Sequence, residues 1–215
     1  MKQKLCVLLG DVLSSRRIED KEAFQEKLEK TCSRINTVYA DEIYAGFKIL
    51  KGIDEIEGVL PDISNIYEII TSISEQLYPN SMRFAFVMDY IDTAVKSRDT
   101  AKMDGPAFHK ASDMMKGLKK SKSLFDMSTD NEITDALITG EINLILLIKK
   151  NWSAKQHLVV REYKRTRNQY ETAKTLGITQ QAVSKALARS MWNEIRPIEE
   201  KLDHVVRSLS VRDNI

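Results

Sequence analysis

The chain has 215 residues, of which 42% are hydrophobic and 30% are charged, and its formal net charge is +2. This composition is typical of a folded globular protein with one large domain or two small ones, and it excludes a disordered or collagen-like chain. The apolar runs Leu5–Leu9 and Ile142–Ile148 are too short for a signal-peptide core and for a membrane span of roughly 20 residues. We therefore expect a cytoplasmic protein without membrane association.

The two cysteines, Cys6 and Cys32, have neither metal-ligand spacing nor partners for a disulfide framework. A strand-like apolar run contains Cys6, and a helix-like run contains Cys32. We expect both to be buried, reduced thiols.

The N-terminal part alternates strand and helix patterns. Apolar runs and residues that alternate with a period of two predict strands, while longer amphipathic stretches predict helices. The expected strands are 5–9, 42–50, 55–60, 82–88 and 123–128, and the expected helices are 20–38, 62–78 and 105–119. Strands 42–50 and 55–60 form a predicted hairpin around Lys51-Gly52-Ile53. The order βαββαβαβ favours a ferredoxin-like or palm-type antiparallel sheet with helices on one face.

The C-terminal part reads as helical from Asn131 onward. The predicted helices are 132–151, 153–165, two short helices within 169–189, and a last helix to about residue 209. We therefore predict an α+β fold with two domains, a palm-like domain at 1–129 and an all-helical domain at 130–215.

Residues 169–189 have the pattern of a helix-turn-helix. Ala173 is small where the second helix would cross the first, and Gly177 can end the first helix in a left-handed conformation. Thr179 can cap the second helix, while Val183 and Leu187 continue an apolar seam between the two. The pattern predicts a DNA reader, although the same geometry also occurs as plain packing or in protein-binding modules.

The second helix of this unit has a polar outer face that suits the major groove. Glutamine can pair with adenine through two hydrogen bonds, serine with several bases, and lysine with guanine or a phosphate. The residues expected to face DNA are Thr179, Gln180, Gln181, Ser184 and Lys185, with Ala188 beside them.

The charge distribution is consistent with this hypothesis. Residues 150–215 contain 13 Lys and Arg against 7 Asp and Glu, whereas residues 1–149 contain 20 against 24. A basic C-terminal part beside a mildly acidic remainder suggests that only the C-terminal part approaches a polyanion. Arg165 and Arg167, just before the unit, lie where backbone phosphates would be met.

Acidic residues follow the first strand and lie at the predicted hairpin. Asp11 ends the first strand, and Asp54 and Glu55 lie at the hairpin. If the first strand lies beside the hairpin, these carboxylates share one end of the sheet and could hold a divalent cation that bridges nucleotide phosphates. Carboxylates at strand ends are also ordinary solvated loop residues, so both interpretations stay open.

The segment Ser14-Ser15-Arg16-Arg17 follows the first strand directly. Its hydroxyl and guanidinium groups, Ser15 and Arg16 above all, could bind a phosphate of a small ligand at the same end of the sheet. A capped, solvated turn accounts for the same residues.

The chain resembles the SatD family of bacterial and archaeal proteins. The matching residues are Gly10-Asp11-Val12 with Ser15-Arg16, 54–58, 104–108 and the C-terminal helix-turn-helix. The N-terminal segments are also remotely similar to the palm fold of nucleotidyl cyclases and GGDEF domains. This resemblance implies an α+β domain with Asp11 and either Asp54 or Glu55 in the metal positions, and Mg²⁺ or Mn²⁺ as the ion.

The sequence departs from the family pattern at the hairpin, where members usually read Gly-Asp-Glu-Phe-Gln-Gly. Ile53 takes the place of the first glycine, and a β-branched residue neither adopts a positive φ easily nor lets phosphate approach the backbone. His109 and Asp113 fall where the cyclases carry a catalytic asparagine and arginine, and an aspartate there would repel the charge that develops in phosphoryl transfer. We interpret the N-terminal domain as a non-catalytic relative of the cyclases.

Three hypotheses of function follow. The first is a regulatory protein that binds double-stranded DNA through the helix-turn-helix as a homodimer, while the N-terminal domain senses a small ligand such as a nucleotide or mediates self-association. The second is a metal-dependent nucleotidyl cyclase or transferase that uses Asp11 and Asp54. The third is a protein-interaction module.

Overall fold

The computed structural model describes residues 2–52 and 54–212, so Ile53 of the predicted hairpin lies outside the described residues. The chain forms two compact units, which we describe separately. Unit 1 comprises Met1–Asn143 and Asp203–Ile215, and unit 2 comprises Leu144–Leu202. The predicted boundary near residue 129 coincides with neither limit of unit 2, and separate folding of 130–215 stays a prediction.

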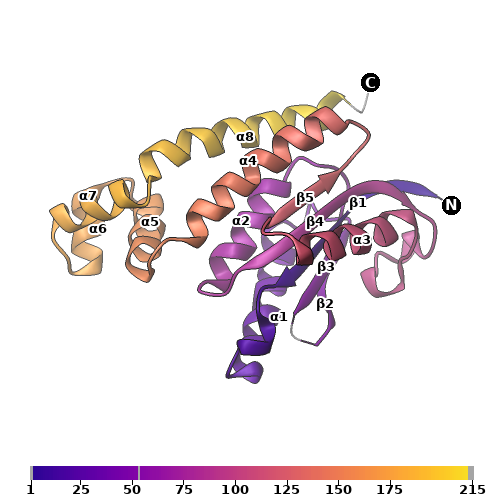
Figure 1. Cartoon of the computed structure of the whole chain (residues 1–215), viewed down its shortest axis with the longest axis horizontal. Helices are drawn as coiled ribbons and strands as arrows, with labels where there is room; N and C mark the ends of the chain where they lie inside the picture. Colours follow the sequence, from indigo (N-terminus) through magenta and orange to yellow (C-terminus); the bar gives the residue numbers. More distant parts are fainter. Residues whose placement is uncertain (1, 53, 213–215) are drawn as a thin grey trace. The chain divides into compact units, whose positions relative to one another are not determined.

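Unit 1 is built on a sheet that has five strands within the described residues (Figure 1). The strands lie in the order β2-β3-β1-β4-β5, with β1 antiparallel to both β3 and β4, and β5 parallel to β4. Their bounds are β1 Gln3–Val12, β2 Ala45–Lys51, β3 Glu55–Leu60, β4 Met82–Ile91 and β5 Phe125–Ser128. The helices of this unit are α1 Lys21–Val38, α2 Ile66–Leu77 and α3 Pro106–Lys120, in the predicted βαββαβαβ order. The α+β fold that the sequence predicts is therefore confirmed.

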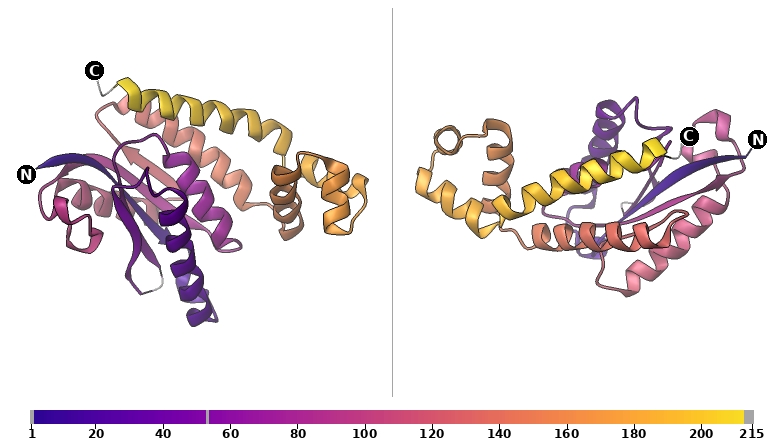
Figure 2. Two further views of the ribbon diagram at one scale, coloured as in Figure 1. Left: turned by 180° about the vertical axis from the view of Figure 1, so that it is seen from behind. Right: turned by 90° about the horizontal axis from the view of Figure 1, so that it is seen from above.

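Both faces of the sheet are covered, which corrects the expectation of helices on one face. Leu5, Val7 and Leu9 of β1 pack with Ala107 and Ala111 of α3 in one apolar cluster. The alternate residues of β1 point the other way and are equally buried. Figure 2 shows α1 and α2 on the sheet face opposite α3. The period-two pattern could not reveal this, because a long buried strand is apolar on both faces.

An irregularity in β2 changes which face its side chains occupy. The pairing of β2 with β3 shifts register between Ala45 and Lys48. Ala45 belongs to the α3-side cluster, whereas the Phe47 ring lies over Gly58, where an added Cβ would come within 2.7 Å of it. A bulge therefore interrupts the period-two alternation within the strand predicted at 42–50.

A glycine fixes the start of α3. Gly105 has φ +152°, and an added Cβ would lie 2.8 Å from the backbone nitrogen of Asp92. No other residue fits there without moving the chain, so Gly105 sets where α3 begins beside β4.

Unit 2 contains the predicted pair of short helices, α6 Gln169–Leu176 and α7 Gln180–Arg189, preceded by α5 Ala154–Thr166. Helices α4 (Glu132–Lys150) and α8 (Trp192–Arg212) each contribute residues to both units. Within unit 2, the Trp152 indole donates a hydrogen bond to the Ser190 carbonyl oxygen at 2.9 Å, and both residues are buried. Among the described helices, none is both long and apolar enough to cross a membrane.

Candidate functional site

The predicted acidic residues meet at one end of the sheet in unit 1. Asp11 of β1 and Glu55 of β3 are direct cross-strand partners, and both lie in the alternation that faces α3. The Asp11 residue is only 4% exposed, which is unusual for a carboxylate and requires charged or hydrogen-bonding partners. The expectation that Asp11 and Glu55 share one end of the sheet is met.

Two basic side chains supply those partners. The Lys119 ammonium, from the last turn of α3, lies 2.8 Å from Oδ1 of Asp11 and 3.1 Å from Oε1 of Glu55. The Arg83 guanidinium, from β4, lies 3.2 Å from Oδ2 of Asp11. Each oxygen of Asp11 thus has its own cation. We call Asp11, Glu55, Arg83 and Lys119 the acidic cluster.

The ion pairs change the titration of Lys119. Partial burial alone would lower the pKa of this ammonium, but hydrogen bonds to Asp11 and Glu55 outweigh burial and raise it above its ordinary value. Lys119 therefore stays charged at neutral pH and holds the end of α3 against the sheet.

The third predicted metal ligand, Asp54, takes a different partner. Its Oδ2 accepts a hydrogen bond from the Ser15 hydroxyl at 3.2 Å. Within the described residues, no group of three or more Asp, Glu, His or Cys side chains could hold a metal ion. The donor set does not fit the divalent cation that the palm resemblance implies, because the Asp11 oxygens already bind two cations.

The predicted phosphate ligands Ser15 and Arg16 lie in a short 3₁₀ turn, Ser15–Arg17. Arg16 is exposed, and the Ser15 hydroxyl is engaged with Asp54. The turn follows Ser14, which adopts a left-handed conformation with φ 55°. A phosphate ligand at this turn stays a prediction.

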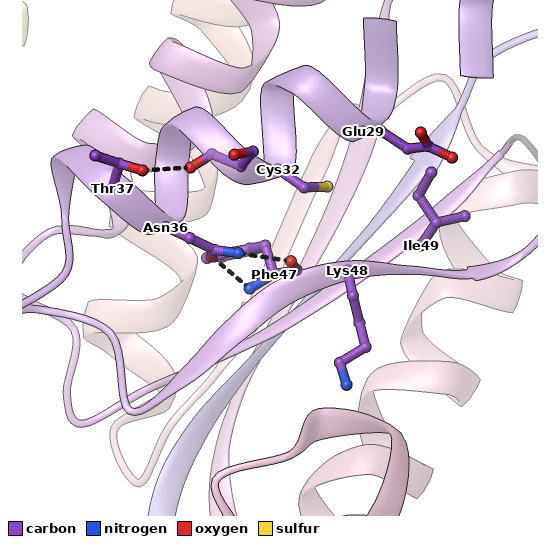
Figure 3. A pocket seen from close by; sticks show the side chains of 8 residues that line it. Glu29, Cys32, Asn36, Thr37, Phe47, Lys48 and Ile49 are labelled. Atoms are coloured by element: carbon purple, nitrogen blue, oxygen red, sulfur yellow. Dashed lines mark hydrogen bonds between the residues drawn. The ribbon is translucent and has the colours of Figure 1, made fainter. Parts of the chain in front are cut away.

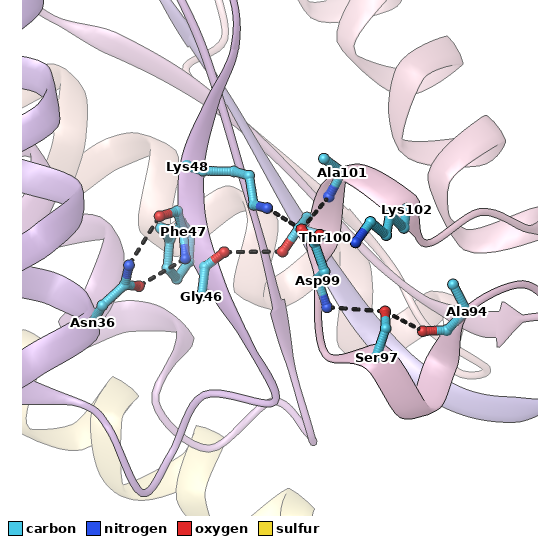
Figure 4. Close-up of polar contacts among 10 residues, drawn as sticks. All are labelled: Asn36, Gly46, Phe47, Lys48, Ala94, Ser97, Asp99, Thr100, Ala101 and Lys102. Atoms are coloured by element: carbon cyan, nitrogen blue, oxygen red, sulfur yellow. Dashed lines mark hydrogen bonds and ion pairs between the residues drawn. The ribbon is translucent and has the colours of Figure 1, made fainter.

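A second polar network fastens the segment after β4 to β2 (Figure 4). The Thr100 hydroxyl donates to the Gly46 carbonyl oxygen at 2.9 Å, and Lys48 forms an ion pair with Asp99. On the other side of β2, the Asn36 side chain bonds both the N–H and the carbonyl of Phe47, at 2.7 and 2.9 Å. Side chains thus satisfy backbone groups of β2 around its bulge.

Glu57 is a buried carboxylate of β3 that the sequence analysis did not single out. It lies opposite Lys48 in the pairing of β2 and β3 and is 8% exposed. Burial, together with the nearby charges of Glu55 and Asp104, raises its pKa to about 7, although Lys48 acts in the opposite direction.

A shallow groove of about 530 Å³ runs between α1 and β2 (Figure 3). Figure 3 shows the Lys48 side chain directed away from α1. Cys32 lines the groove, and burial raises the pKa of its thiol to about 11, so this thiol is not a reactive thiolate at neutral pH. Cys6 and Cys32 are both buried, as predicted, and within the described residues neither is part of a disulfide.

In unit 2, capping and turn residues define α6 and α7. The Asn168 side chain accepts hydrogen bonds from the backbone N–H groups of Tyr170 and Glu171 and begins α6. Gly177 ends α6 with φ 62°, and Thr179 begins α7 by accepting a hydrogen bond from the Ala182 N–H at 3.1 Å. The predicted roles of Gly177 and Thr179 are therefore confirmed.

The outer side of α7 carries the residues predicted to face DNA. Val183 and Leu187 are buried on the inner side of α7. No hydrogen bond or ion pair to the rest of the described chain engages the outer side chains. We call this surface the α7 face, and its exposed members are Gln180, Gln181, Ser184, Lys185 and Ala188.

The basic residues predicted to meet phosphates lie at the end of α5. Arg165 is exposed and forms an ion pair with Glu162 at 2.5 Å, within the same helix. Arg167 is exposed and adopts a left-handed conformation with φ 53°, and its Nε donates to the Lys164 carbonyl oxygen at 3.1 Å. Of the two, Arg165 is the one whose charge is already paired.

Comparisons with known proteins complete the description. The model of the SatD family matches residues 5–194. No curated protein matches the chain. The chain is similar to the solved structure of a bacterial light-regulated adenylyl cyclase, at 13% identity and a TM-score of 0.41 over 60% of this chain and 77% of that one.

Two further solved structures are similar at comparable levels. The adenylyl cyclase CyaB from P. aeruginosa is 14% identical, with a TM-score of 0.44 over 65% of this chain and 82% of that one. A regulator of polyketide synthase expression from Bifidobacterium adolescentis is 12% identical, with a TM-score of 0.32 over 98% of this chain and 82% of that one. These levels carry no argument about activity.

Proposed function

The chain belongs to the SatD family, and from this premise we propose that it is a regulatory protein that binds duplex DNA through α7. The observation that carries the proposal is the α7 face. Its two glutamines, serine and lysine are exposed and make no bond to the described remainder of the chain, so all four side chains are open to an external partner. These side-chain types suit base edges and phosphates in the major groove.

The local geometry supports the same function. The turn at Gly177–Thr179 separates two short helices, and the Thr179 cap fixes the first turn of α7. In helix-turn-helix proteins the first turns of the second helix contact base edges, and Gln180, Gln181 and Ser184 occupy these turns here. The Thr179 hydroxyl oxygen accepts the capping hydrogen bond, so we propose that Thr179 contacts DNA by donating its hydroxyl proton.

Dimerisation is part of the proposal. One short recognition helix buries little surface, so tight and specific binding calls for two copies on a palindromic site with half-sites about 10 base pairs apart. We propose that unit 1 mediates self-association or senses a small ligand, and that the protein acts in the cytoplasm. A metal-dependent transferase is not proposed, because the acidic cluster lacks free carboxylate oxygens on Asp11.

The test is fluorescence anisotropy against a pool of labelled genomic duplexes over a salt series from about 50 to 200 mM. We expect binding that weakens steeply with salt and that falls by at least about 30-fold in Gln181→Ala/Lys185→Ala, since each of the two lost contacts contributes about 1–3 kcal/mol. The matched control is Lys110→Ala, which removes an exposed lysine from α3 and should leave binding unchanged.

Two results would contradict the proposal. The first is an absence of binding at every salt concentration. The second is binding with a shallow salt dependence that the double variant leaves intact, which would point to a protein partner for this surface instead.

A further inference from the structure

Asp11 and Glu55 are placed as a cation-binding pair would be. They are cross-strand partners on the same face of β1 and β3, which puts their Cβ atoms about 5 Å apart. Carboxylates at this separation can share one divalent ion, with oxygens about 2.0–2.6 Å from the metal. A shared divalent ion would therefore lie in the space between the two carboxylates.

That space holds an ammonium group. Lys119 Nζ contacts Asp11 at 2.8 Å and Glu55 at 3.1 Å, while Arg83 takes the remaining Asp11 oxygen at 3.2 Å. We infer that this site is filled from within, with the Lys119 ammonium in the place between Asp11 and Glu55 that a divalent cation would need.

The position of Lys119 follows from how α3 is anchored. Gly105 fixes the start of the helix against the backbone of Asp92, and the buried Ala107 and Ala111 fix its rotation against the sheet. Lys119 then falls in the last turn, where the helix dipole also favours a positive charge. The internal cation is thus delivered by the packing of the whole helix, and it is present in every folded molecule.

Charge balance argues against adding a metal ion to the intact cluster. Asp11 and Glu55 carry two negative charges, and Lys119 and Arg83 carry two positive charges. A divalent ion would need carboxylate oxygens that are already bound, and it would meet two cations at short range. It can enter only where Lys119 leaves, and the Lys119 side chain is 42% exposed, so a substitution there opens the site to solvent.

This inference goes beyond the proposed function and does not depend on DNA binding. It predicts that the intact protein is indifferent to Mg²⁺ and Mn²⁺ at this site, and that removal of one ammonium group uncovers a latent metal site. The Mn²⁺ ion itself is the probe, because its electron paramagnetic resonance signal in solution reports the free ion and gives the bound fraction by difference.

The experiment compares Mn²⁺ binding by the full-length protein, Lys119→Met and Lys119→Met/Glu55→Gln. We expect Lys119→Met to bind one Mn²⁺ at least tenfold more tightly than the intact protein, and the double variant to lose this gain. The matched control is Lys120→Met, which removes the adjacent exposed lysine and should behave as the intact protein does. A parallel gain in melting temperature with Mn²⁺ should appear in Lys119→Met alone.

Several results would overturn the inference. One is tight Mn²⁺ binding by the intact protein that Glu55→Gln abolishes, and this measurement needs no lysine variant to fold. Another is a folded Lys119→Met that gains no Mn²⁺ binding, since the two carboxylates would then not form a cation site whatever stands between them. Lys119→Gln, which keeps much of the side-chain length, serves if the methionine variant does not fold.

Discussion

The acidic cluster of unit 1 and the α7 face of unit 2 are both polar, but their charges and hydrogen bonds go to different places. In the acidic cluster, each Asp11 oxygen has a basic partner, and Lys119 serves two carboxylates at once. On the α7 face, no bond within the described chain engages Gln181 or Lys185. The first region uses its polar groups to hold the fold, whereas the polar groups of the second are open to solvent.

Polar residues that look functional in a sequence can therefore contribute to the protein in two different ways. Buried charged groups with complete partners contribute to stability and specificity of folding, and losing one partner leaves the other charge exposed to a desolvation penalty. Exposed groups without partners contribute little to stability, so their substitution leaves the fold intact and reports on binding instead. The two regions should therefore respond oppositely to substitution.

The largest expected effect is on folding and concerns Asp11. Asp11→Asn removes two ion pairs and leaves Arg83, whose side chain is only 19% exposed, without its carboxylate. We expect the free energy of unfolding to fall by about 3 kcal/mol, measured by urea denaturation. Asp113→Asn is the control, because Asp113 is exposed and pairs only with Lys116 on the same helix at 2.7 Å, so its loss should cost less than about 0.5 kcal/mol. Equal effects of the two substitutions would show that the ion pairs of Asp11 contribute no more to stability than an exposed pair on one helix.

The second effect is a pH dependence of stability from Glu57. Its pKa is raised to about 7 in the folded protein by burial and by Glu55 and Asp104, so the folded state holds this proton more tightly than the unfolded state. The contribution is complete below the ordinary carboxyl pKa of about 4.3 and is lost as the pH rises to about 7. A shift of this size, from about 4.3 to about 7, corresponds to a loss of roughly 3–4 kcal/mol.

Glu57→Gln isolates this contribution from the other titrating groups. The variant should gain stability relative to the parent protein between pH 5 and pH 8, because the parent comes to hold a buried negative charge over this range. Urea denaturation of both proteins at the two pH values measures the difference. A constant difference between them at pH 5 and pH 8 would show that Glu57 keeps an ordinary pKa.

The sequence predicted the local features of both regions correctly. The strand and helix order, the left-handed Gly177, the Thr179 cap and the outward position of Gln181 and Lys185 all depend on residues close in the chain. Their chemistry is local, so a pattern of neighbouring residues suffices. The expectation that the first strand lies beside the hairpin also put Asp11 at the same end of the sheet as Asp54 and Glu55, and the strand register confirms this for Asp11 and Glu55.

The partners of those residues could not be predicted from the sequence. Arg83 and Lys119 lie 72 and 108 positions beyond Asp11, on separate elements, and nothing in their surroundings distinguishes them from the other basic residues. The bulge in β2 and the helices on both faces of the sheet also depend on tertiary packing. Sequence reasoning therefore identified the carboxylates but could not tell that their charges were already neutralised.

The smallest expected effect concerns Arg165, which stands between the two classes of residue. Arg165 is a predicted phosphate contact, yet its guanidinium already lies 2.5 Å from the Glu162 carboxylate. The hydrogen bond from Arg165 lowers the pKa of Glu162. If α5 approaches phosphates as proposed, Glu162 both competes for Arg165 and repels the DNA backbone. Glu162→Gln should then tighten DNA binding by about two- to threefold at low salt, which is the effect expected of an exposed ion pair, and the gain should fade at high salt.

Anisotropy measures this change in affinity. Glu171→Gln, at an exposed position on α6, tests whether the loss of any negative charge has the same result. An equal gain in both variants would mean that Arg165 acts only through the net charge of unit 2 and makes no phosphate contact of its own.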